Sequence, residues 1–340
     1  MKHRSIILSL TVLALGYVSP IVAQPSEIKL EPAQAKITTV SAMRVRKAPQ
    51  VTAEEIVRLK LGAIVNATAR STNQDTIGGK TEYWYRVSVS NGATGWLFGG
   101  LLLDYTARQR QALLRQIIEA RLKAENTDFA DRQEIYNLAT SSTDEAKDTS
   151  TRAEFELLKL LALANWAPSF PDGDSDKRTY REWLKAHESE VILNEFAGGY
   201  NLRSELLWDL EKKYHALPIA DRIAWEAAQN PQPSDCEGDE VCGFFRTIPE
   251  IKYLELYPAG AHTAEALSDL AEAITDDVIT RANAKGGDQY AIDEQAALKK
   301  ELTFLRRVVT KTSAAEKTEL LKRPNPILLN YKIPPHRFLC

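Results

Sequence analysis

The sequence predicts a multidomain α+β protein in which a small all-β barrel precedes an all-α helical domain. The chain has 340 residues, and one domain usually takes about 100–200 residues, so more than one core is expected. From residue 37 to residue 105 the apolar side chains come in short clusters separated by turn residues, as in strands. Beyond Tyr105 they recur about every 3.6 residues, as on the buried face of helices.

The composition excludes several classes of protein. Apolar residues make up 44% of the chain and charged residues 26%, which is typical of a folded globular protein and excludes a disordered one. Three cysteines in 340 residues exclude a disulfide-dense mini-protein. The formal net charge is −3 and the pI is near 6.1. Because binding to a phosphate backbone depends on positive charge, we expect no nucleic-acid partner.

The amino terminus has the pattern of a secretory signal peptide. Lys2, His3 and Arg4 precede an apolar run from Ile6 to Val18, and small residues follow up to Ala23. This pattern predicts export and cleavage after residue 23. The alternative, a membrane anchor, is disfavoured because the run is shorter than the ~20 apolar residues that span a bilayer. We therefore expect removal of 1–23, a periplasmic or secreted protein, and no membrane span after cleavage.

The segment that follows divides into a short lead-in and a region of strands. Residues 24–36 contain proline, alanine and charges of both signs, and we interpret them as a linker. Residues 37–105 carry β-branched and aromatic clusters separated by turn residues, among them Gly62 and the pair Asn91-Gly92. An Asn-Gly pair is a strong hairpin signal because both residues tolerate a positive φ. Short strands at this spacing predict a small barrel.

Four segments of this region resemble the bacterial SH3-like (SH3b) domain and occur in that family's order. Met43–Pro49 (MRVRKAP) is similar to the opening "LNVRSGP", and Ile56–Gly62 (IVRLKLG) to the hairpin "VIGTLKKG". Trp84–Val87 (WYRV) and Gly92–Leu97 (GATGWL) are similar to "WYKV" and "G.TGWV". The sequence departs from the family at Lys47-Ala48, where Ser-Gly is usual. The resemblance implies a small all-β SH3-like barrel.

The resemblance also implies a binding module, directed at cell-wall peptide or at a neighbouring domain, with no chemistry of its own. We expect Tyr83, Trp84 and Arg86 beside an edge of the barrel. There, flat aromatic rings cover a sugar or a peptide and the guanidinium pairs with a carboxylate. The alternative for Trp84 and Trp96 is that both fill the barrel core. That alternative is favoured for Trp96 and stays open for Trp84.

Residues 106–322 are predicted to form one α-helical domain, followed by a proline-containing C-terminal tail at 323–340. A division of this domain near Pro168–Asp174 is the alternative. Glu250–Pro258 with the alanine-rich stretch behind it resembles the helix-turn-helix of tetratricopeptide-like proteins, but no second copy follows at that period, so an ordinary helical hairpin is the simpler interpretation. Predicted features in order are helices at Leu113–Leu122 and Phe129–Leu138, a polar loop at Ser141–Thr149, a helix opened by the capping box Thr151–Glu154, helices at 178–193, 204–214, 218–229, 248–256, 262–283 and 288–310, and a short helix opened at Ser313.

The cysteines predict one disulfide. Cys236 and Cys242 flank a short acidic segment that contains Gly238, and in an oxidising compartment such a pair forms a disulfide within the loop. A zinc site would need four ligands, and no histidine lies near them. Cys340 is the odd cysteine, and the sequence does not decide between a free thiol and a bond between chains.

We find no motif for catalysis, a cofactor or a metal. The zincin pattern, the nucleophile elbow, the phosphate-binding loop and the dinucleotide fingerprint are all missing from the sequence. Asp172–Asp176 alternates acids like the start of a calcium loop, but Lys177 and Trp183 stand where that loop needs glycine and glutamate. We therefore expect an acidic surface turn there, no cofactor and no metal.

Two functional hypotheses remain. The first is a non-enzymatic binding or adaptor protein of the bacterial cell envelope. In it, the SH3b module binds cell-wall peptide or an envelope protein and the helical domain acts as a scaffold. The second is a cell-wall hydrolase in which the module provides targeting and a buried carboxyl of raised pKa in the helical domain provides catalysis.

Overall fold

The computed structural model describes residues 27–89, 92–169, 178–195, 199–231, 236–284, 287, 289–314 and 317. Several of the sequence-based expectations concern residues outside these ranges. They are the signal peptide at 1–23, the acidic turn at Asp172–Asp176, the tail at 323–340, Asn91 of the expected hairpin, and Cys340.

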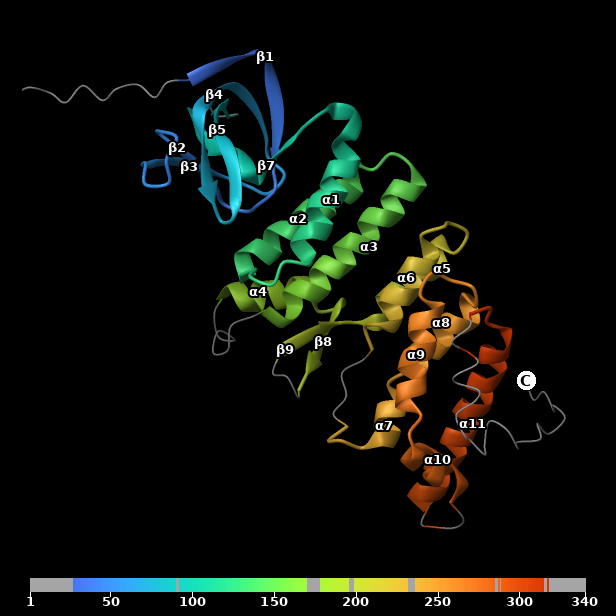
Figure 1. Ribbon diagram of the computed structural model, residues 1–340. Coiled ribbons are helices and arrows are strands. Elements are labelled where there is room, and N and C mark those ends of the chain that lie inside the picture. Colours follow the sequence, from blue (N-terminus) through green and yellow to red (C-terminus); the bar gives the residue numbers. More distant parts are fainter. Residues whose placement is uncertain are drawn as a thin grey trace, which may run out of the picture. The chain divides into compact units, whose positions relative to one another are not determined.

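The chain divides into two compact units (Figure 1). The β unit takes the described residues up to Lys36 together with Arg44–Arg58 and Val65–Leu102. The helical unit takes Ile37–Met43, Leu59–Ile64 and the described residues from Leu103 onward. The expected order of a β region followed by a helical region is therefore confirmed.

The β region is an antiparallel sheet in which some adjacent strands are neighbours in the sequence and others come from distant segments. In the described part of the chain, seven strands lie in the order β3-β2-β6-β5-β4-β1-β7. Strand β5 lies inside the sheet between β4 and β6, with Trp84 opposite Phe98 and Arg86 opposite Trp96. The strands are β1 (Glu27–Thr38), β2 (Met43–Arg46), β3 (Glu55–Leu59), β4 (Ile64–Ile77), β5 (Lys80–Ser88), β6 (Thr94–Phe98) and β7 (Leu102–Asp104).

The expected linker at 24–36 is wrong for residues 27–36, which form most of β1. The first part of this strand is mostly exposed, and only its end at Lys36, Ile37 and Thr38 is buried. The strand is held by its place between β4 and β7 in the sheet. Backbone pairing with neighbouring strands satisfies its polar groups without an apolar pattern, so composition alone did not reveal it.

Gly95, in the Thr94-Gly95-Trp96 segment, lies where strands β2 and β6 approach each other closely. A Cβ on Gly95 would lie 2.6 Å from Cγ1 of Val45 and 2.7 Å from the carbonyl oxygen of Arg46. Strands β2 and β6 therefore come closer than a larger residue allows. The loop after β2 closes without glycine, because the Lys47 amide donates to the Glu54 carbonyl at 2.9 Å and Arg46 donates to the Ala53 carbonyl at 2.7 Å.

The helical unit contains a series of helices and one short hairpin of strands. The hairpin pairs Val191 with Leu202 in antiparallel register. The elements are α1 (Arg110–Leu122), α2 (Phe129–Glu145), α3 (Thr149–Trp166), α4 (Arg178–His187), β8 (Val191–Asn194), β9 (Gly199–Leu202), α5 (Ser204–Tyr214), α6 (Ala220–Ala228), α7 (Glu240–Phe245), α8 (Ile248–Leu256), α9 (Thr263–Ala273), α10 (Asp276–Asn283) and α11 (Gln289–Lys311), with 3₁₀ turns η1 (Gly99–Leu101), η2 (Ala107–Gln109) and η3 (Ala167–Ser169).

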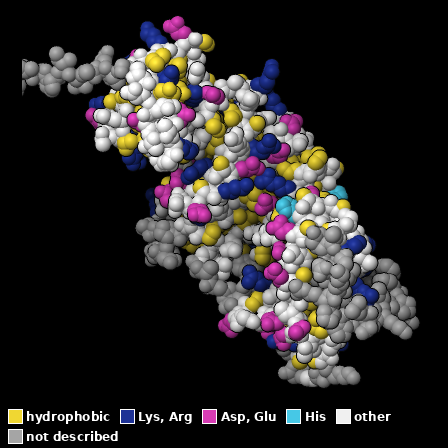
Figure 2. Space-filling view, viewed as in Figure 1, with side chains coloured by type: hydrophobic (Ala, Val, Ile, Leu, Met, Phe, Trp, Pro, Cys, Tyr) yellow, Lys and Arg dark blue, Asp and Glu magenta, His cyan; other side chains and the backbone are white. Residues whose placement is uncertain are grey.

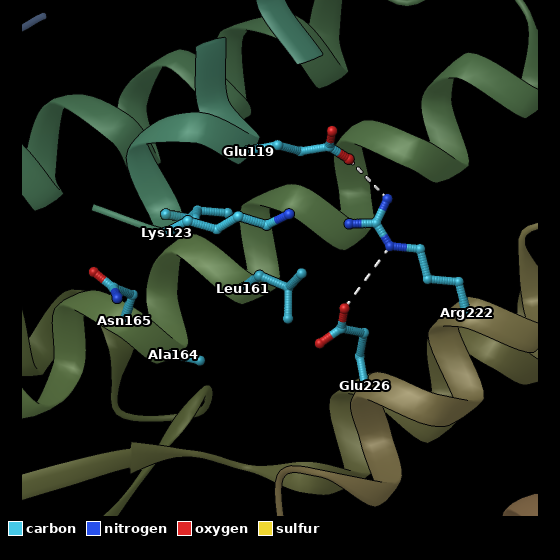
Figure 3. Close-up of a pocket in the computed structure, with 8 residues that line it drawn as sticks. Glu119, Lys123, Leu161, Ala164, Asn165, Arg222 and Glu226 are labelled. Atoms are coloured by element: carbon cyan, nitrogen blue, oxygen red, sulfur yellow. Dashed lines mark hydrogen bonds and ion pairs between the residues drawn. The ribbon is translucent and has the colours of Figure 1, made fainter. Parts of the chain in front are cut away.

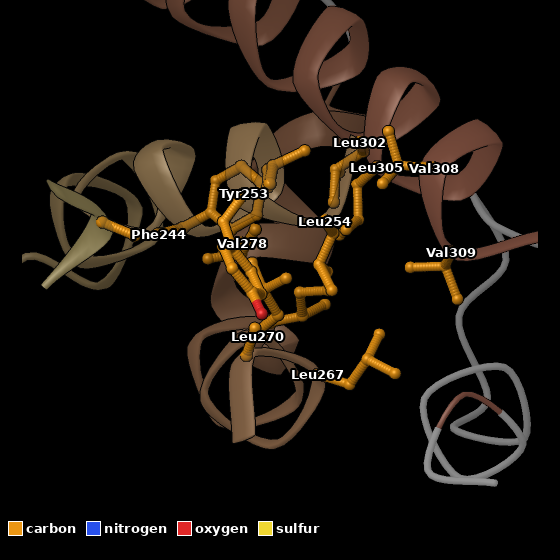
Figure 4. Close-up of a cluster of buried hydrophobic side chains, with 14 of the residues drawn as sticks. Phe244, Tyr253, Leu254, Leu267, Leu270, Val278, Leu302, Leu305, Val308 and Val309 are labelled. Carbon is orange, nitrogen blue, oxygen red and sulfur yellow. The ribbon is translucent and has the colours of Figure 1, made fainter. Parts of the chain in front are cut away.

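Adjoining hydrophobic cores run through the helical unit and share helices. Helices α1, α2 and α3 enclose the first core, and α3 also contributes Leu157 and Leu163 to the second core with α5 and α6. Helix α6 reaches the third core, formed with α7 to α11 (Figure 4). Tyr253 is fully buried there, and its hydroxyl donates to Asp221 at 2.6 Å, which satisfies the polar end of a buried ring. Because α3 and α6 each contribute to two cores, the three cores are connected within the helical unit.

Two helices have the bounds that the sequence predicts, whereas the end of α2 and the start of α3 differ from the prediction. Helices α5 and α8 are confirmed residue for residue. The polar loop expected at Ser141–Thr149 is shorter than predicted, because α2 continues to Glu145 and α3 begins at Thr149, which leaves only residues 146–148 between them. The hydroxyl side chains of α2 donate to carbonyls one turn earlier, as Ser142 does to Leu138 at 2.7 Å. Helix α3 is capped by Asp148, which accepts from the Thr151 amide at 2.8 Å, so the cap lies before the expected capping box.

Two further expectations are corrected. The helix predicted over 178–193 ends at His187, and Val191–Asn194 form β8. The helix predicted over 262–283 is two helices, because Thr275 caps α10 with its hydroxyl oxygen, which accepts from the Val278 amide. A threonine that serves as a cap has non-helical backbone angles and therefore interrupts the run.

The surface of the helical unit is typical of solvated helices. On the face shown in Figure 2, basic and acidic side chains are interspersed over the helices without a broad field of one sign. Among the described helices, none is both long enough and apolar enough to span a bilayer.

Candidate functional site

Strand β5 carries the three residues that the sequence proposes for binding. In the structure they differ from one another in burial. Tyr83 is half-buried, Trp84 is buried and Arg86 is exposed. Alternation along a strand sends neighbouring side chains to opposite faces. The three residues therefore do not form one continuous patch.

Trp84 belongs to the core of the β unit. Its side chain is 3% exposed and lies edge-on to Phe98, with ring centroids 5.7 Å apart. Its indole N–H donates to Asp75 at 2.6 Å, which supplies the partner that a buried indole needs. Trp84 therefore fills the core, which is the alternative that the sequence left open for it, and its ring is not on the surface expected for a ligand. Trp96, at 4% exposed, lies in the same cluster.

Tyr83 forms a stacked pair with Arg70 of strand β4. The guanidinium carbon of Arg70 lies 3.9 Å from the centre of the Tyr83 ring. This distance is well inside the range of a cation–π contact, and the guanidinium remains a planar donor group for a carboxylate. Arg70 is not predicted from the sequence, because it is 13 positions from Tyr83 and comes close only through the pairing of β4 with β5.

Arg86 already holds a carboxylate. One of its terminal nitrogens, Nη1, lies 2.9 Å and 3.1 Å from the two oxygens of Glu27. Its side chain is 46% exposed, so solvent weakens the pair. The pairing shows that the position accepts a carboxylate, and also that a ligand carboxylate must replace Glu27.

A second aromatic residue of β5 lies beside a buried cation. The ammonium of Lys36 lies 4.5 Å from the centre of the Tyr85 ring, and Lys36 is only 7% exposed. A Cβ on Gly99 would come within 2.7 Å of the same ring. Tyr85 stands between two of the proposed residues in the sequence, but it was not selected, because nothing local indicates that the end of β1 reaches it.

The two paired cysteines close a loop at the start of α7. Their sulfurs are 2.04 Å apart and their Cα atoms 5.4 Å apart. Inside the loop, Asp239 accepts from the Cys242 amide at 2.9 Å and caps α7. Asp239 also pairs with Arg281 of α10 at 2.9 Å. These contacts lower the pKa of Asp239, first through the amide of Cys242 and then through Arg281.

One carboxyl of the helical unit has the property that the hydrolase hypothesis requires. Burial raises the pKa of Glu250 to about 7, and the nearby charge of Asp269 adds to the shift. Its Oε2 atom is buried and has no hydrogen-bond partner among the described residues. A carboxyl of this kind is partly protonated at neutral pH and can act as a general acid. Asp269 lines an adjoining open cavity of about 420 Å³ together with Glu240 and Glu272.

Comparison with known proteins bears on the β unit. Residues 41–102 match the family model of the bacterial SH3 domain. No curated protein and no solved structure is significantly similar to the chain. The tetratricopeptide-like resemblance of the segment from Glu250 to Pro258 has no support in these comparisons. The chain is thus a multidomain α+β protein with a bacterial SH3 domain before its helical unit, and SH3 domains of this kind bind peptides or cell-wall components.

Proposed function

We propose that the protein is an exported, non-enzymatic binding protein of the bacterial cell envelope. Its SH3 domain binds cell-wall peptide or an envelope protein, and its helical unit serves as a scaffold. The match of residues 41–102 to the bacterial SH3 domain carries this proposal.

The distribution of charge supports an acidic ligand for the SH3 domain. Residues 41–102 contain eight Lys and Arg against four Asp and Glu, whereas the whole chain contains 43 against 46. Positive charge is therefore concentrated in the domain, and it attracts carboxylates from solution. Arg70 and Arg86 are the guanidinium groups most directly placed for such a ligand, one over the Tyr83 ring and one on Glu27.

Two features support export to an oxidising compartment. The first 23 residues have the charge and apolar pattern of a signal peptide. The bond between Cys236 and Cys242 is of a kind that persists outside the cytosol. We therefore place the mature protein in the periplasm or outside the cell.

Cosedimentation with purified peptidoglycan tests the binding function. The protein beginning at Gln24 is incubated with peptidoglycan, and the pellet and supernatant are compared. We expect retention in the pellet and a severalfold loss on Arg70→Glu, because the change reverses a charge on the Tyr83 stack. Arg108→Glu makes the same charge change at an exposed residue outside the domain and should leave retention unchanged. Equal retention of the wild type and Arg70→Glu would contradict a role of Arg70 in binding. No retention of the wild type would contradict binding to peptidoglycan and favour a protein partner.

Glu250 favours a second candidate function, a cell-wall hydrolase. A carboxyl that keeps its proton near pH 7 is the group that protonates a departing glycosidic oxygen. In the same incubation this function predicts soluble muropeptides in the supernatant, detected by chromatography. Glu250→Gln keeps the shape of the side chain but cannot donate a proton from a carboxyl, and it should abolish their release. The absence of released fragments with the wild type would exclude this candidate.

A further inference from the structure

A cleft in the helical unit lies where α1, α3 and α6 meet (Figure 3). It is open to solvent, and its volume is about 420 Å³, within the usual range for sites that bind small ligands. Its apolar side chains come from two helices. Its lining residues are Glu119, Leu122, Lys123, Leu161, Ala164, Asn165, Arg222 and Glu226.

The apolar part of the cleft gives a ligand a surface to bury. Leu122 comes from the end of α1, and Leu161 and Ala164 come from successive turns of α3. All three side chains are only partly buried, so the protein itself does not cover them. Covering this surface with an apolar group removes it from water, which favours binding in proportion to the apolar area covered.

Four charged side chains surround that surface, and they differ in how closely they are ion-paired. The guanidinium of Arg222 lies 2.8 Å from Glu119, across the cleft between α6 and α1, and 3.8 Å from Glu226. Glu226 therefore has only a loose partner at the cleft. Lys123 is exposed and has no ion-pair partner among the described residues. Figure 3 shows Lys123 and Glu226 on different sides of Leu161.

We propose that this cleft binds a short peptide with both termini charged and an apolar side chain. The ammonium of the peptide pairs with Glu226, its carboxylate pairs with Lys123, and its apolar side chain covers Leu161 and Ala164. The carboxamide of Asn165, at the edge of the cleft, is a donor and acceptor for the peptide bond.

The same charges disfavour other ligand classes. Two carboxylates and two cations give the cleft no net charge, so a phosphate or another polyanion meets Glu119 and Glu226 as well as Arg222 and Lys123. A purely apolar ligand leaves those four groups partly desolvated without new partners, which costs free energy. A zwitterion with an apolar group offers charged partners to the carboxylates and cations of the cleft, and its apolar group covers the apolar part.

Isothermal titration of the full mature chain with leucyl-alanine tests the proposal, alongside the N-acetylated and the C-amidated forms of the same dipeptide. We expect saturable binding of the dipeptide and a loss of about fivefold to tenfold for each capped form, the size of one partly exposed charged hydrogen bond. Lys123→Ala should weaken binding by a similar factor, and amidation should then have no further effect. Glu226→Gln should likewise remove the effect of acetylation and leave that of amidation.

Matched variants separate this site from general charge effects. Lys212→Ala on α5 and Glu255→Gln on α8 remove the same charges at exposed positions outside the cleft lining and should bind the dipeptide normally. Ala164→Phe should block binding by filling the cleft, and a melting curve verifies that this variant is folded. Additive effects of Lys123→Ala and amidation would overturn the assignment. So would the absence of saturable binding to the folded wild type.

The cleft and the SH3 domain are tested independently. Retention on peptidoglycan measures the SH3 domain and does not depend on Lys123, whereas dipeptide titration measures the cleft. A failure of the dipeptide titration therefore leaves the proposed function standing, and a failure of retention leaves the cleft standing.

Discussion

Opening the disulfide between Cys236 and Cys242 should lower the stability of the helical unit by a small, calculable amount. The perturbation is the double replacement by serine, which keeps the size of both side chains close to that of a cysteine. It removes the covalent closure around the start of α7. The packing of Phe244 and Val241 in the core behind the loop is unchanged by the substitution itself.

The magnitude follows from the length of the loop. The two cysteines are 6 positions apart, and the loop-closure relation for so short a loop gives about 2 kcal/mol at 25 °C. The Asp239 cap and its pair with Arg281 are exposed to solvent, so their loss adds little to this. We therefore expect about 2 kcal/mol. For a unit of this size that corresponds to a fall in Tm of roughly 4–8 °C.

Thermal unfolding followed by circular dichroism at 222 nm measures the change. The comparison is made in the Cys340→Ser background, so that the third thiol does not exchange with the pair. A reductant should lower the Tm of the parent to that of the double variant and leave the double variant unchanged. If the parent and the double variant melt within 1 °C of one another, the loop does not contribute as the closure relation requires. A reductant effect on the double variant would point to another cause.

Three further outcomes are expected. Gly95→Ala should destabilise the β unit by about 1–3 kcal/mol in urea unfolding, since its Cβ would overlap Val45, whereas Gly243→Ala meets nothing within 4 Å and should cost nothing. Glu250 has a folded pKa of about 7 against 4.5, so it binds its proton more tightly when folded, and stability should fall as the pH rises between these values. Glu250→Gln should therefore raise Tm at pH 8 and hardly at pH 5, and the reverse order would contradict the buried environment. Glu27→Gln should tighten binding of an acidic peptide by up to about fivefold by freeing Arg86, and a fluorescence titration in which Arg86→Ala keeps that gain would refute the competition.

Local signals in the sequence were sufficient where local contacts determine the structure. Helices α5 and α8 begin and end where their apolar period does. The four SH3-like segments lie within residues 41–102, which match the bacterial SH3 domain. Gly92, with φ of +81°, has the backbone that a tight turn needs, in keeping with its place in the Asn-Gly pair.

Long-range contacts decide what the sequence did not reveal. Residues 27–36 become a strand through pairing with β4 and β7, and nothing within the segment indicates this. The core position of Trp84 depends on Asp75 and Phe98, which lie on neighbouring strands. The partner of Arg86 is 59 positions away. The high pKa of Glu250 arises from burial among helices that are separate in the sequence.

The pair between Arg86 and Glu27 has a consequence for the kind of ligand that the SH3 domain can hold. A carboxylate attached to the same chain is present at an effective concentration on the order of millimolar. A single free carboxylate at micromolar concentration therefore does not displace Glu27 from a site of this exposure. A ligand that presents several carboxylates along its length competes better, because each engaged carboxylate raises the local concentration of the next. Under the proposed function, the Arg86 position therefore favours a ligand with repeated carboxylates over an isolated acidic peptide.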